Sequence, residues 1–241
     1  PVSIAFADLN GDGVVDMAIA NAFGDSVSVL TGAADGSFDS SVEVDAGNGS
    51  GSIAIADVNG DSHPDILTAD RWSNTISILF GQSDGTFQPP QQLNAGSEPY
   101  VVLTSDLDGN GTTDIAVTNY DSDTISVFLG HGDGKFPPRR DIATRQEPTF
   151  VVASDLNKDG APDLAVVGEA AQTVSILFGN GDGTFPEREH LSTGRSPNGI
   201  AVADLNKDNA QDLITANAGE GTVSVLLGNA DGSFQPHDDF F

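Results

Sequence analysis

The chain has 241 residues, of which 36 are Asp or Glu and nine are Lys or Arg, so its formal net charge is −27 at pH 7. Such an acidic surface repels phosphate backbones and anionic lipid head groups, which argues against nucleic-acid and membrane-surface partners. The lack of Cys excludes disulfides and thiolate zinc sites, and no apolar run approaches the roughly 20 residues of a membrane span, so we expect no membrane insertion.

One unit of 49 residues is repeated five times along the chain. An aspartate, a glycine and a phenylalanine each recur at this interval without insertion or deletion, which indicates a single repeat domain over residues 1–241. The first recurring aspartates are Asp8, Asp57, Asp106, Asp155 and Asp204. The units are 1–49, 50–98, 99–147, 148–196 and 197–241.

Each unit is expected to hold four short strands. The first is apolar and small, and the second follows an acidic loop, as at 114–119. The third alternates β-branched residues with Ser, as at 124–128 and 222–226, which is typical of a strand. The fourth carries a single apolar residue, which suits an exposed outer edge. The first strands are expected at 3–7, 52–56, 101–105, 150–154 and 199–203, and the apolar residues of the fourth are Val44, Leu93, Ile142, Leu191 and Phe240.

The third and fourth strands are joined by Gly-x-x-Asp-Gly-x-Phe, as at 179–185, where Asp-Gly is typical of a tight hairpin. Four antiparallel strands in a period of this length predict blades of a β-propeller. The predicted fold class is therefore all-β: a β-propeller of five four-stranded antiparallel blades of 49 residues each, with almost no helix. We expect the repeated Phe to pack between neighbouring blades. Two forms remain open: a closed five-blade ring, or an arc completed by other chains or further blades.

The loop between the first and second strands repeats a nine-residue acidic pattern. Positions 1, 3, 5 and 9 carry Asp or Asn in all five loops, and position 7 can offer a backbone carbonyl. Ca²⁺ takes six to eight oxygen ligands, which a tightly curled loop can bring together. Position 6 must turn sharply; Ser62 and Asn209 replace Gly there, so we expect the second and fifth loops to be the weakest sites. The candidate metal ligands are Asp8, Asn10, Asp12, Val14 and Asp16; Asp57, Asn59, Asp61, His63 and Asp65; Asp106, Asp108, Asn110, Thr112 and Asp114; Asp155, Asn157, Asp159, Ala161 and Asp163; and Asp204, Asn206, Asp208, Ala210 and Asp212.

Turn-forming loops that bind no metal are the alternative, since Asp, Asn and Gly are common in turns. Five loops in register favour Ca²⁺, and we expect up to five ions. Mg²⁺ fits less well because its strict octahedron usually retains several waters. Transition metals would favour His or Cys ligands, and the four His occupy unrelated positions of the repeat. An EF-hand is excluded because its Glu at position 12 is missing and the flanking segments are strands.

Three features of the sequence resemble FG-GAP/VCBS repeats, as found in integrin α-subunit propellers. They are the loop pattern Asp-x-[Asn/Asp]-x-[Asp/Asn]-Gly-x-x-Asp, the Asp-[Leu/Ile]-Ala-Val stretches that follow it, and the sequence Leu-Phe-Gly-Asn-Gly-Asp-Gly-Thr-Phe at 177–185. The resemblance covers the whole chain. It implies calcium loops between the first two strands of propeller blades. It implies no single function, because members of the family are adhesion modules, lectins, scaffolds or accessory domains of secreted bacterial enzymes.

The loops between the second and third strands differ among the units and lie on the blade face opposite the acidic loops. They contain Phe23, Arg71, Trp72 and Tyr120. Function concentrates on loops held by a rigid scaffold, and Trp, Tyr and Arg are common binding anchors. We therefore expect this face to bind a glycan or a protein. The alternative is that Trp72 and Tyr120 only cover the ends of the blades.

The predicted function is a calcium-binding recognition, adhesion or scaffold module, extracellular or at the surface of a bacterial cell, with lectin-like binding and self-assembly as open roles. The alternative is a propeller domain of a secreted polysaccharide-active enzyme. The sequence has no Ser-His-Asp, Gly-x-Ser-x-Gly, His-Glu-x-x-His or phosphate-loop pattern, so we expect no catalytic residue. Glu98, Glu147 and Glu169 are the modest candidates for a catalytic acid.

Overall fold

The computed structural model describes residues 1–241, apart from the side chain of Ser40. The secondary structure consists of twenty strands in five four-stranded sheets. In the part of the chain that the structure describes there is no helix, and thus none that could cross a membrane. The prediction of an all-β chain with four antiparallel strands in each unit is confirmed.

Each sheet is built by one unit, with its strands in chain order. Unit 1 contains β1 (Ser3–Ala7), β2 (Asp16–Asn21), β3 (Ser26–Gly32) and β4 (Phe38–Asp45). Unit 2 contains β5 (Ser50–Ala56), β6 (Asp65–Asp70), β7 (Thr75–Leu79) and β8 (Gln91–Asn94). Unit 3 contains β9 (Pro99–Ser105), β10 (Asp114–Asn119), β11 (Thr124–Phe128) and β12 (Arg140–Ala143). Unit 4 contains β13 (Pro148–Ser154), β14 (Asp163–Gly168), β15 (Thr173–Phe178) and β16 (Glu187–Ser192). Unit 5 contains β17 (Pro197–Ala203), β18 (Asp212–Asn217), β19 (Thr222–Leu226) and β20 (Asp238–Phe240).

The first strands of units 2 to 5 begin two residues earlier than the sequence predicts. The register between first and second strands shifts there; in unit 3, for example, Pro99 pairs with Asn119 beyond an irregularity between Val117 and Asn119. Proline is tolerated at the first residue of a strand because its missing N–H is not needed there. The apolar stretch used to predict the first strands does not extend through such a bulge.

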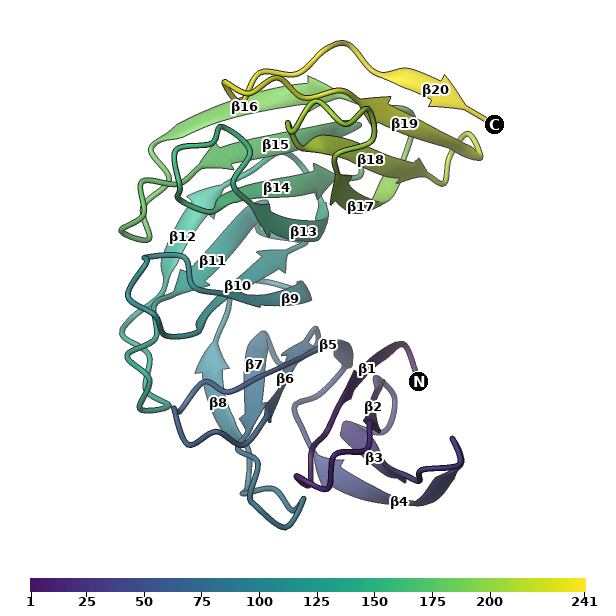
Figure 1. Cartoon of the computed structure of the whole chain (residues 1–241), viewed down its shortest axis with the longest axis vertical. Helices are drawn as coiled ribbons and strands as arrows, with labels where there is room; N and C mark the ends of the chain where they lie inside the picture. Colours follow the sequence, from purple (N-terminus) through teal and green to yellow (C-terminus); the bar gives the residue numbers. More distant parts are fainter.

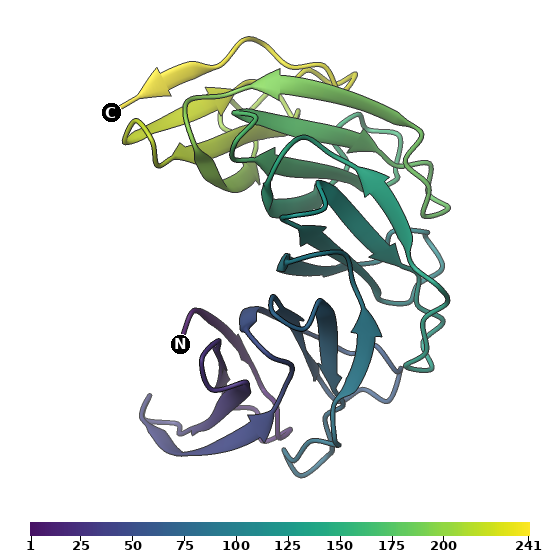
Figure 2. The ribbon, with the colours of Figure 1, turned by 180° about the vertical axis from the view of Figure 1, so that it is seen from behind.

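The five sheets follow one another along an arc (Figure 1). The first strand of each unit lies on the concave side of the arc and the fourth on the convex side, and Figure 2 shows the same order from behind. Units 1 and 5 lie at opposite ends with a gap between them. Each sheet in the described chain uses only strands of its own unit. Of the two forms left open by the sequence, the closed five-blade ring is therefore wrong, and the arc is found.

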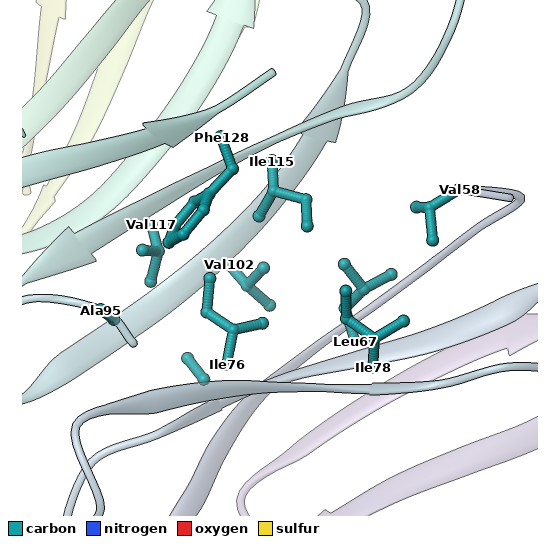
Figure 3. Packing of buried hydrophobic residues seen from close by; sticks show 10 residues of the cluster. Val58, Leu67, Ile76, Ile78, Ala95, Val102, Ile115, Val117 and Phe128 are labelled. Carbon is teal, nitrogen blue, oxygen red and sulfur yellow. The ribbon is translucent and has the colours of Figure 1, made fainter. Parts of the chain in front are cut away.

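The hydrophobic core is divided among the four interfaces between neighbouring units. Successive residues of a strand point to opposite faces of its sheet, so Ile66 packs towards unit 1 and Leu67 towards unit 3. Figure 3 shows the interface of units 2 and 3, where Ile76 lies near Val102 and Ile78 lies beside Leu67. Full burial of such a side chain stabilises the fold by about 1.5–3 kcal/mol. Each unit thus depends on its neighbours for most of its core.

The repeated phenylalanines occupy these interfaces, as predicted, in four of the five units. Phe87, Phe136, Phe185 and Phe234 each pack into the cluster that their unit shares with the preceding one. Phe38 belongs to unit 1, which has no preceding unit in the described chain, and its side chain is exposed.

Candidate metal centres and binding face

The acidic loops are curled by hydrogen bonds between their own side chains and backbone. In unit 1, Asp8 at position 1 accepts the N–H groups of Gly11 and Gly13, each at 2.8 Å. Asn10 at position 3 accepts the N–H of Asp12 at 2.9 Å, and similar bonds recur in the other loops. Positions 1 and 3 therefore direct oxygen atoms towards the interior of a compact loop.

The aspartate at position 9 is buried and has a second role that the sequence analysis missed. Asp16 accepts the N–H of Leu9 through Oδ2 and the N–H of Gly32 through Oδ1, both at 2.8 Å. The same two bonds recur in the other four units. The sequence signal is a glycine sixteen residues after this aspartate in every unit. Position 9 therefore joins the acidic loop to the end of the third strand.

The glycine of this pair is required by a close approach of two backbone segments. A Cβ atom on Gly32 would lie 2.1 Å from the carbonyl oxygen of Val15, and one on Gly130 would lie 2.3 Å from that of Thr113. A larger residue would push the third strand away from the acidic loop. The recurring glycine of the repeat thus follows from the same contact as the recurring aspartate.

Two positions of each acidic loop adopt left-handed backbone conformations. Position 6 does so in all five loops, including Ser62 with a φ of 67° and Asn209 with a φ of 68°. Position 4 is also left-handed, even where it is Lys158 or Lys207, which the sequence analysis did not foresee. Side chains at such positions cost roughly 1–2 kcal/mol per residue unless surrounding contacts hold them.

Carboxylates crowd together in these loops. Asp106, Asp108 and Asp114 each offer one carboxylate oxygen, and these atoms lie within 4.8 Å of one another. Burial, together with the neighbouring carboxylates Asp61 and Asp57, raises the pKa of Asp65 to about 6, against the hydrogen bonds from Val58 and Gly81.

The pKa of Asp163 and that of Asp114 are also raised, first by burial. A bound cation would offset this cost of ionisation. The side-chain donors are all hard oxygens and occur in a tight loop, so the residues present fit Ca²⁺ better than a transition metal.

The loops of units 1 to 4 are supported by the hairpin of the following unit. Gly85 in the hairpin of unit 2 packs so closely that a Cβ atom would lie 2.8 Å from that of Asn10, and Gly232 approaches Asn157 in the same way. In the fifth loop, Leu205 at position 2 is 47% exposed, whereas its four counterparts are 2% exposed or less. The fifth loop is therefore less enclosed than the other four, and the weakness of the second and fifth sites stays a prediction.

On the opposite face, the structure brings together three of the four predicted binding residues. Phe23, Arg71 and Trp72 line one pocket of about 650 Å³. The ring centroids of Phe23 and Trp72 lie 5.3 Å apart, with the ring planes at 52°. The indole lies against Gly49, where a Cβ atom would come within 2.8 Å of it. Trp72 is still 52% exposed and Phe23 90%, so both rings are open to a ligand.

Arg71 continues this cluster into a second group of rings. Its guanidinium donates to Glu98 at 2.9 Å and lies 4.6 Å from the ring centroid of Tyr100. Tyr100 stacks on Tyr120 at 5.7 Å, and the Tyr120 hydroxyl donates to Glu147 at 3.0 Å. Burial, followed by this bond to Glu147, raises the pKa of Tyr120 to about 12, so Tyr120 remains a donor at neutral pH.

The sequence analysis missed Tyr100, which links Arg71 to Tyr120. Its repeat counterparts include Gly51 and Thr149, so an aromatic residue at this position is particular to unit 3. Trp72 was also chosen because its residue type is particular to one unit, but only the loops between the second and third strands were compared in this way. Tyr100 lies in a first strand, on the concave side of the arc.

The repeat itself matches a family model. The model, described as an FG-GAP-like repeat, matches residues 8–68, 57–117, 106–166 and 155–215. The chain belongs to the FG-GAP-like repeat family. Each match begins at the first aspartate of an acidic loop and ends in the second strand of the next FG-GAP unit. No curated protein matches the chain.

Solved structures similar to this FG-GAP chain come from several bacteria. A functionally unknown protein from Desulfotomaculum acetoxidans is 12% identical with a TM-score of 0.71; the match covers 99% of this chain and 69% of that one. The Pseudomonas aeruginosa periplasmic gluconolactonase PpgL is 18% identical with a TM-score of 0.66, over 99% and 69%. The Vibrio cholerae biofilm matrix protein Bap1 is 20% identical with a TM-score of 0.56, over 96% of this chain and 38% of Bap1. At these identities the likeness concerns the fold alone.

Proposed function

We propose that this FG-GAP chain is a calcium-binding recognition module whose five units form part of a β-propeller. Its binding face is the set of loops between second and third strands. The observation that carries the proposal is the exposed pair Phe23 and Trp72, which lies beside Arg71 in one pocket and whose indole packs against Gly49. Aromatic rings held open in this way offer large contact area at low cost in side-chain entropy.

In this proposal Ca²⁺ stabilises the scaffold and takes no part in catalysis. The side-chain oxygens of positions 1, 3, 5 and 9 and the carbonyl of position 7 would hold one ion in each loop. The ion would supply the positive charge that three carboxylates in one loop lack. Extracellular calcium modules work with dissociation constants of about 10⁻⁴–10⁻³ M, which suits the proposed extracellular or cell-surface location on a bacterium.

The chemistry of the face favours an uncharged ligand. A sugar ring or an apolar protein side chain can stack on Trp72. Arg71 is already paired with Glu98, so little positive charge is left to attract an anion, and the net charge of −27 repels polyanions. A neutral glycan is the ligand class that we propose first, and a protein surface second.

We propose binding rather than catalysis. Two of the three candidate acids, Glu98 and Glu147, are engaged as acceptors for Arg71 and Tyr120. The name gluconolactonase belongs to the Pseudomonas protein, with which this chain shares the fold at 18% identity. Release of product from a polysaccharide incubated with the protein would favour the alternative of a secreted polysaccharide-active enzyme.

A binding screen with a matched variant tests the proposal. The protein, saturated with Ca²⁺, is applied to glycan and protein arrays, and each retained ligand is titrated against Trp72→Ala. We expect a loss of about 2 kcal/mol or more, roughly 30-fold in dissociation constant. Phe241→Ala, which removes another exposed aromatic ring outside the pocket, serves as the control. Unchanged affinity in both Trp72→Ala and Tyr120→Ala would move the binding site elsewhere.

A further inference from the structure

A groove lies between units 1 and 2, apart from the aromatic pocket on the binding face. Its walls are strands β3 and β4 of unit 1 and residues 85–90 of unit 2, and its volume is about 460 Å³. It shares no lining residue with the pocket of Trp72. Its size lies within the range of small-ligand sites. We call it the outer groove, and its lining includes Val42, Glu43, Val44, Asp45, Phe87 and Pro90.

The walls of the outer groove are apolar and partly open to solvent. Val42 is 63% exposed, and Val44, Phe87 and Pro90 are half-buried. Val44 and Phe87 lie at the border of the hydrophobic cluster that units 1 and 2 share. The outer groove therefore extends the apolar core of this interface to the surface, and apolar surface of this kind marks interaction sites.

In the equivalent groove between units 2 and 3, an arginine of the chain itself lies against the wall. Arg139 lines that groove beside Leu93 and donates from Nη1 to the carbonyl oxygen of Asn94 at 2.9 Å. Between units 3 and 4, Arg188 donates in the same way to the carbonyl oxygen of Ala143 at 2.9 Å. Both carbonyl groups belong to the last residue of a fourth strand. An arginine side chain therefore fits this place in the repeat, with its guanidinium at the end of that strand.

A second side chain bridges each of the same two interfaces. Gln91 donates to the carbonyl oxygen of Gly134 at 3.0 Å, and Arg140 donates to that of Gly183 at 3.3 Å. Each of these bonds joins the fourth strand of one unit to the hairpin of the next. Two side-chain donors thus bridge the interface of units 2 and 3, and two more bridge that of units 3 and 4.

Neither bridge can form at the outer groove. Val42 and Pro90 stand at the positions of these donors, and neither side chain can donate a hydrogen bond. Pro90 therefore offers nothing to the carbonyl oxygen of Asp45, the last residue of β4. At the interface of units 4 and 5 the two positions hold Glu189 and His237. The interface of units 1 and 2 is thus the one that has an apolar residue at both positions.

The charges at the outer groove are negative. Glu43 and Asp45 line it, and none of its lining residues in the described chain is basic. The hydroxyl groups of Ser26 and Ser28 donate to Glu43 and lower the pKa of its carboxyl, so Glu43 is ionised at neutral pH. Carboxylates beside an apolar wall suit a cationic group on an apolar stem, and the planar guanidinium of arginine matches carboxylate and carbonyl acceptors.

We propose that the outer groove binds an arginine side chain of a partner protein, flanked in that partner by apolar residues. The guanidinium would donate to the carbonyl oxygen of Asp45, as Arg139 donates to that of Asn94, and would lie beside the carboxylate of Glu43. The stem and the flanking side chains would cover Val42. The partner would thus supply the side chain that the chain itself supplies at the next two interfaces. This site is separate from the proposed glycan site and from the acidic loops.

Two matched peptides test the proposal on the natural chain. Acetyl-Leu-Arg-Leu-amide and acetyl-Leu-citrulline-Leu-amide differ in the charge of one side chain. Each is titrated while the methyl signals of Val42 and Val44 are followed by NMR. We expect the arginine peptide to shift these signals and to bind at least about tenfold more tightly than the citrulline peptide. Equal affinity for the two peptides would mean that the groove selects only apolar groups, and this result or an absence of shifts would overturn the proposal.

Pro90→Arg gives the groove an arginine of its own, as in the next two units, and is expected to weaken binding of the arginine peptide at least about tenfold. Two variants serve as controls. Pro90→Ala removes the proline ring alone, and Ser83→Arg adds the same charge in the hairpin of unit 2, outside the groove. Both are expected to bind the peptide as the natural chain does. If Pro90→Arg also binds it equally well, the peptide does not occupy the groove and the proposal is overturned.

Other occupants and other sites give different results. Dimerisation of the chain in sedimentation velocity that Pro90→Arg abolishes would make a second copy the occupant, and would overturn the proposal. Trp72→Ala is expected to leave peptide binding unchanged, because Trp72 lies outside the groove. Loss of peptide binding in that variant would place the peptide in the aromatic pocket and would also overturn the proposal. Loss of glycan binding in the same variant bears only on the proposed function.

Discussion

The carboxylate of Asp16 accepts the backbone N–H of Gly32 at 2.8 Å, and this contact ties the acidic loop of unit 1 to the end of its third strand. The other Asp16 oxygen accepts the N–H of Leu9 within the loop. A carboxylate oxygen has a second lone pair, so these bonds leave room for a cation. The proposed metal site and the sheet therefore share one buried side chain in every unit, and their stabilities are expected to be coupled.

Removal of calcium is expected to lower the melting temperature by many degrees. A ligand that binds only the folded state stabilises it by mass action, and at 100 times the dissociation constant each site contributes about 2.7 kcal/mol. With dissociation constants near 10⁻⁴ M, 10 mM Ca²⁺ would stabilise five independent sites by more than about 10 kcal/mol in total. Differential scanning calorimetry in excess Ca²⁺ and in excess EGTA measures the effect. Identical melting curves would contradict the calcium assignment.

Asp114→Asn is expected to destabilise the protein even without Ca²⁺, by about 2 kcal/mol, because a neutral amide replaces the buried carboxylate that accepts the N–H groups of Leu107 and Gly130. Asp108→Asn is the matched control, since the other four loops already carry Asn at that position. It is expected to lower stability only when Ca²⁺ is present, and in EGTA to leave stability unchanged or raise it, because it removes one of three crowded carboxylates. Urea unfolding in EGTA separates the two variants. If both behave alike there, position 9 has no structural role of its own.

Gly130→Ala is expected to cost several kcal/mol, or to prevent folding, because its Cβ would lie 2.3 Å from the carbonyl oxygen of Thr113. Gly199→Ala has open space around the new Cβ and serves as the control. We expect its thermal midpoint to stay the same or to rise by a few degrees, since alanine reduces the freedom of the unfolded chain. The prediction fails if both variants melt at the same temperature.

Asp70→Asn is expected to change the pH dependence of stability. Asp70 is fully buried and accepts hydroxyl groups of Ser50, Thr68 and Ser77. Burial raises its pKa above the ordinary value of 3.8 against these hydrogen bonds. A raised pKa means that the folded state favours the protonated form, so stability from this group is lost as pH rises through the folded-state pKa. Asn119, its counterpart in unit 3, donates to Thr124 and Ser126, which shows that an amide fits at this position.

Chemical unfolding between pH 4 and 8 is the measurement. The variant is expected to gain stability relative to the natural chain as pH rises. The control is Asp35→Asn, because hydrogen bonds from Ser37 lower the pKa of this exposed carboxyl below 3.8, so the relative stability of that variant is expected to stay nearly constant above about pH 4. A constant difference between Asp70→Asn and the natural chain across this range would show that Asp70 does not titrate as inferred.

The repeat made the order and pairing of the strands predictable, because a strand that is unclear in one unit can be assigned from the same positions of the other four. It could not predict the contacts that only packing creates. The constant spacing of Asp16 and Gly32 marks both residues as part of the repeat but does not show that they are hydrogen-bonded to each other, and Tyr100 joins the aromatic cluster through stacking. Lys158 adopts a left-handed backbone conformation that lysine disfavours, because the surrounding loop imposes it, so its residue type could not predict it.

The arrangement of the cores between units has a consequence for how the molecule comes apart. The main contacts between strands of different units join each unit to the one before and the one after it. Unit 3 has a neighbour on both sides, whereas units 1 and 5 each have a single neighbour. In such a row of coupled units, the end units are expected to open more readily than the middle one. Backbone hydrogen exchange is therefore expected to be slowest in unit 3 and to quicken outwards in both directions.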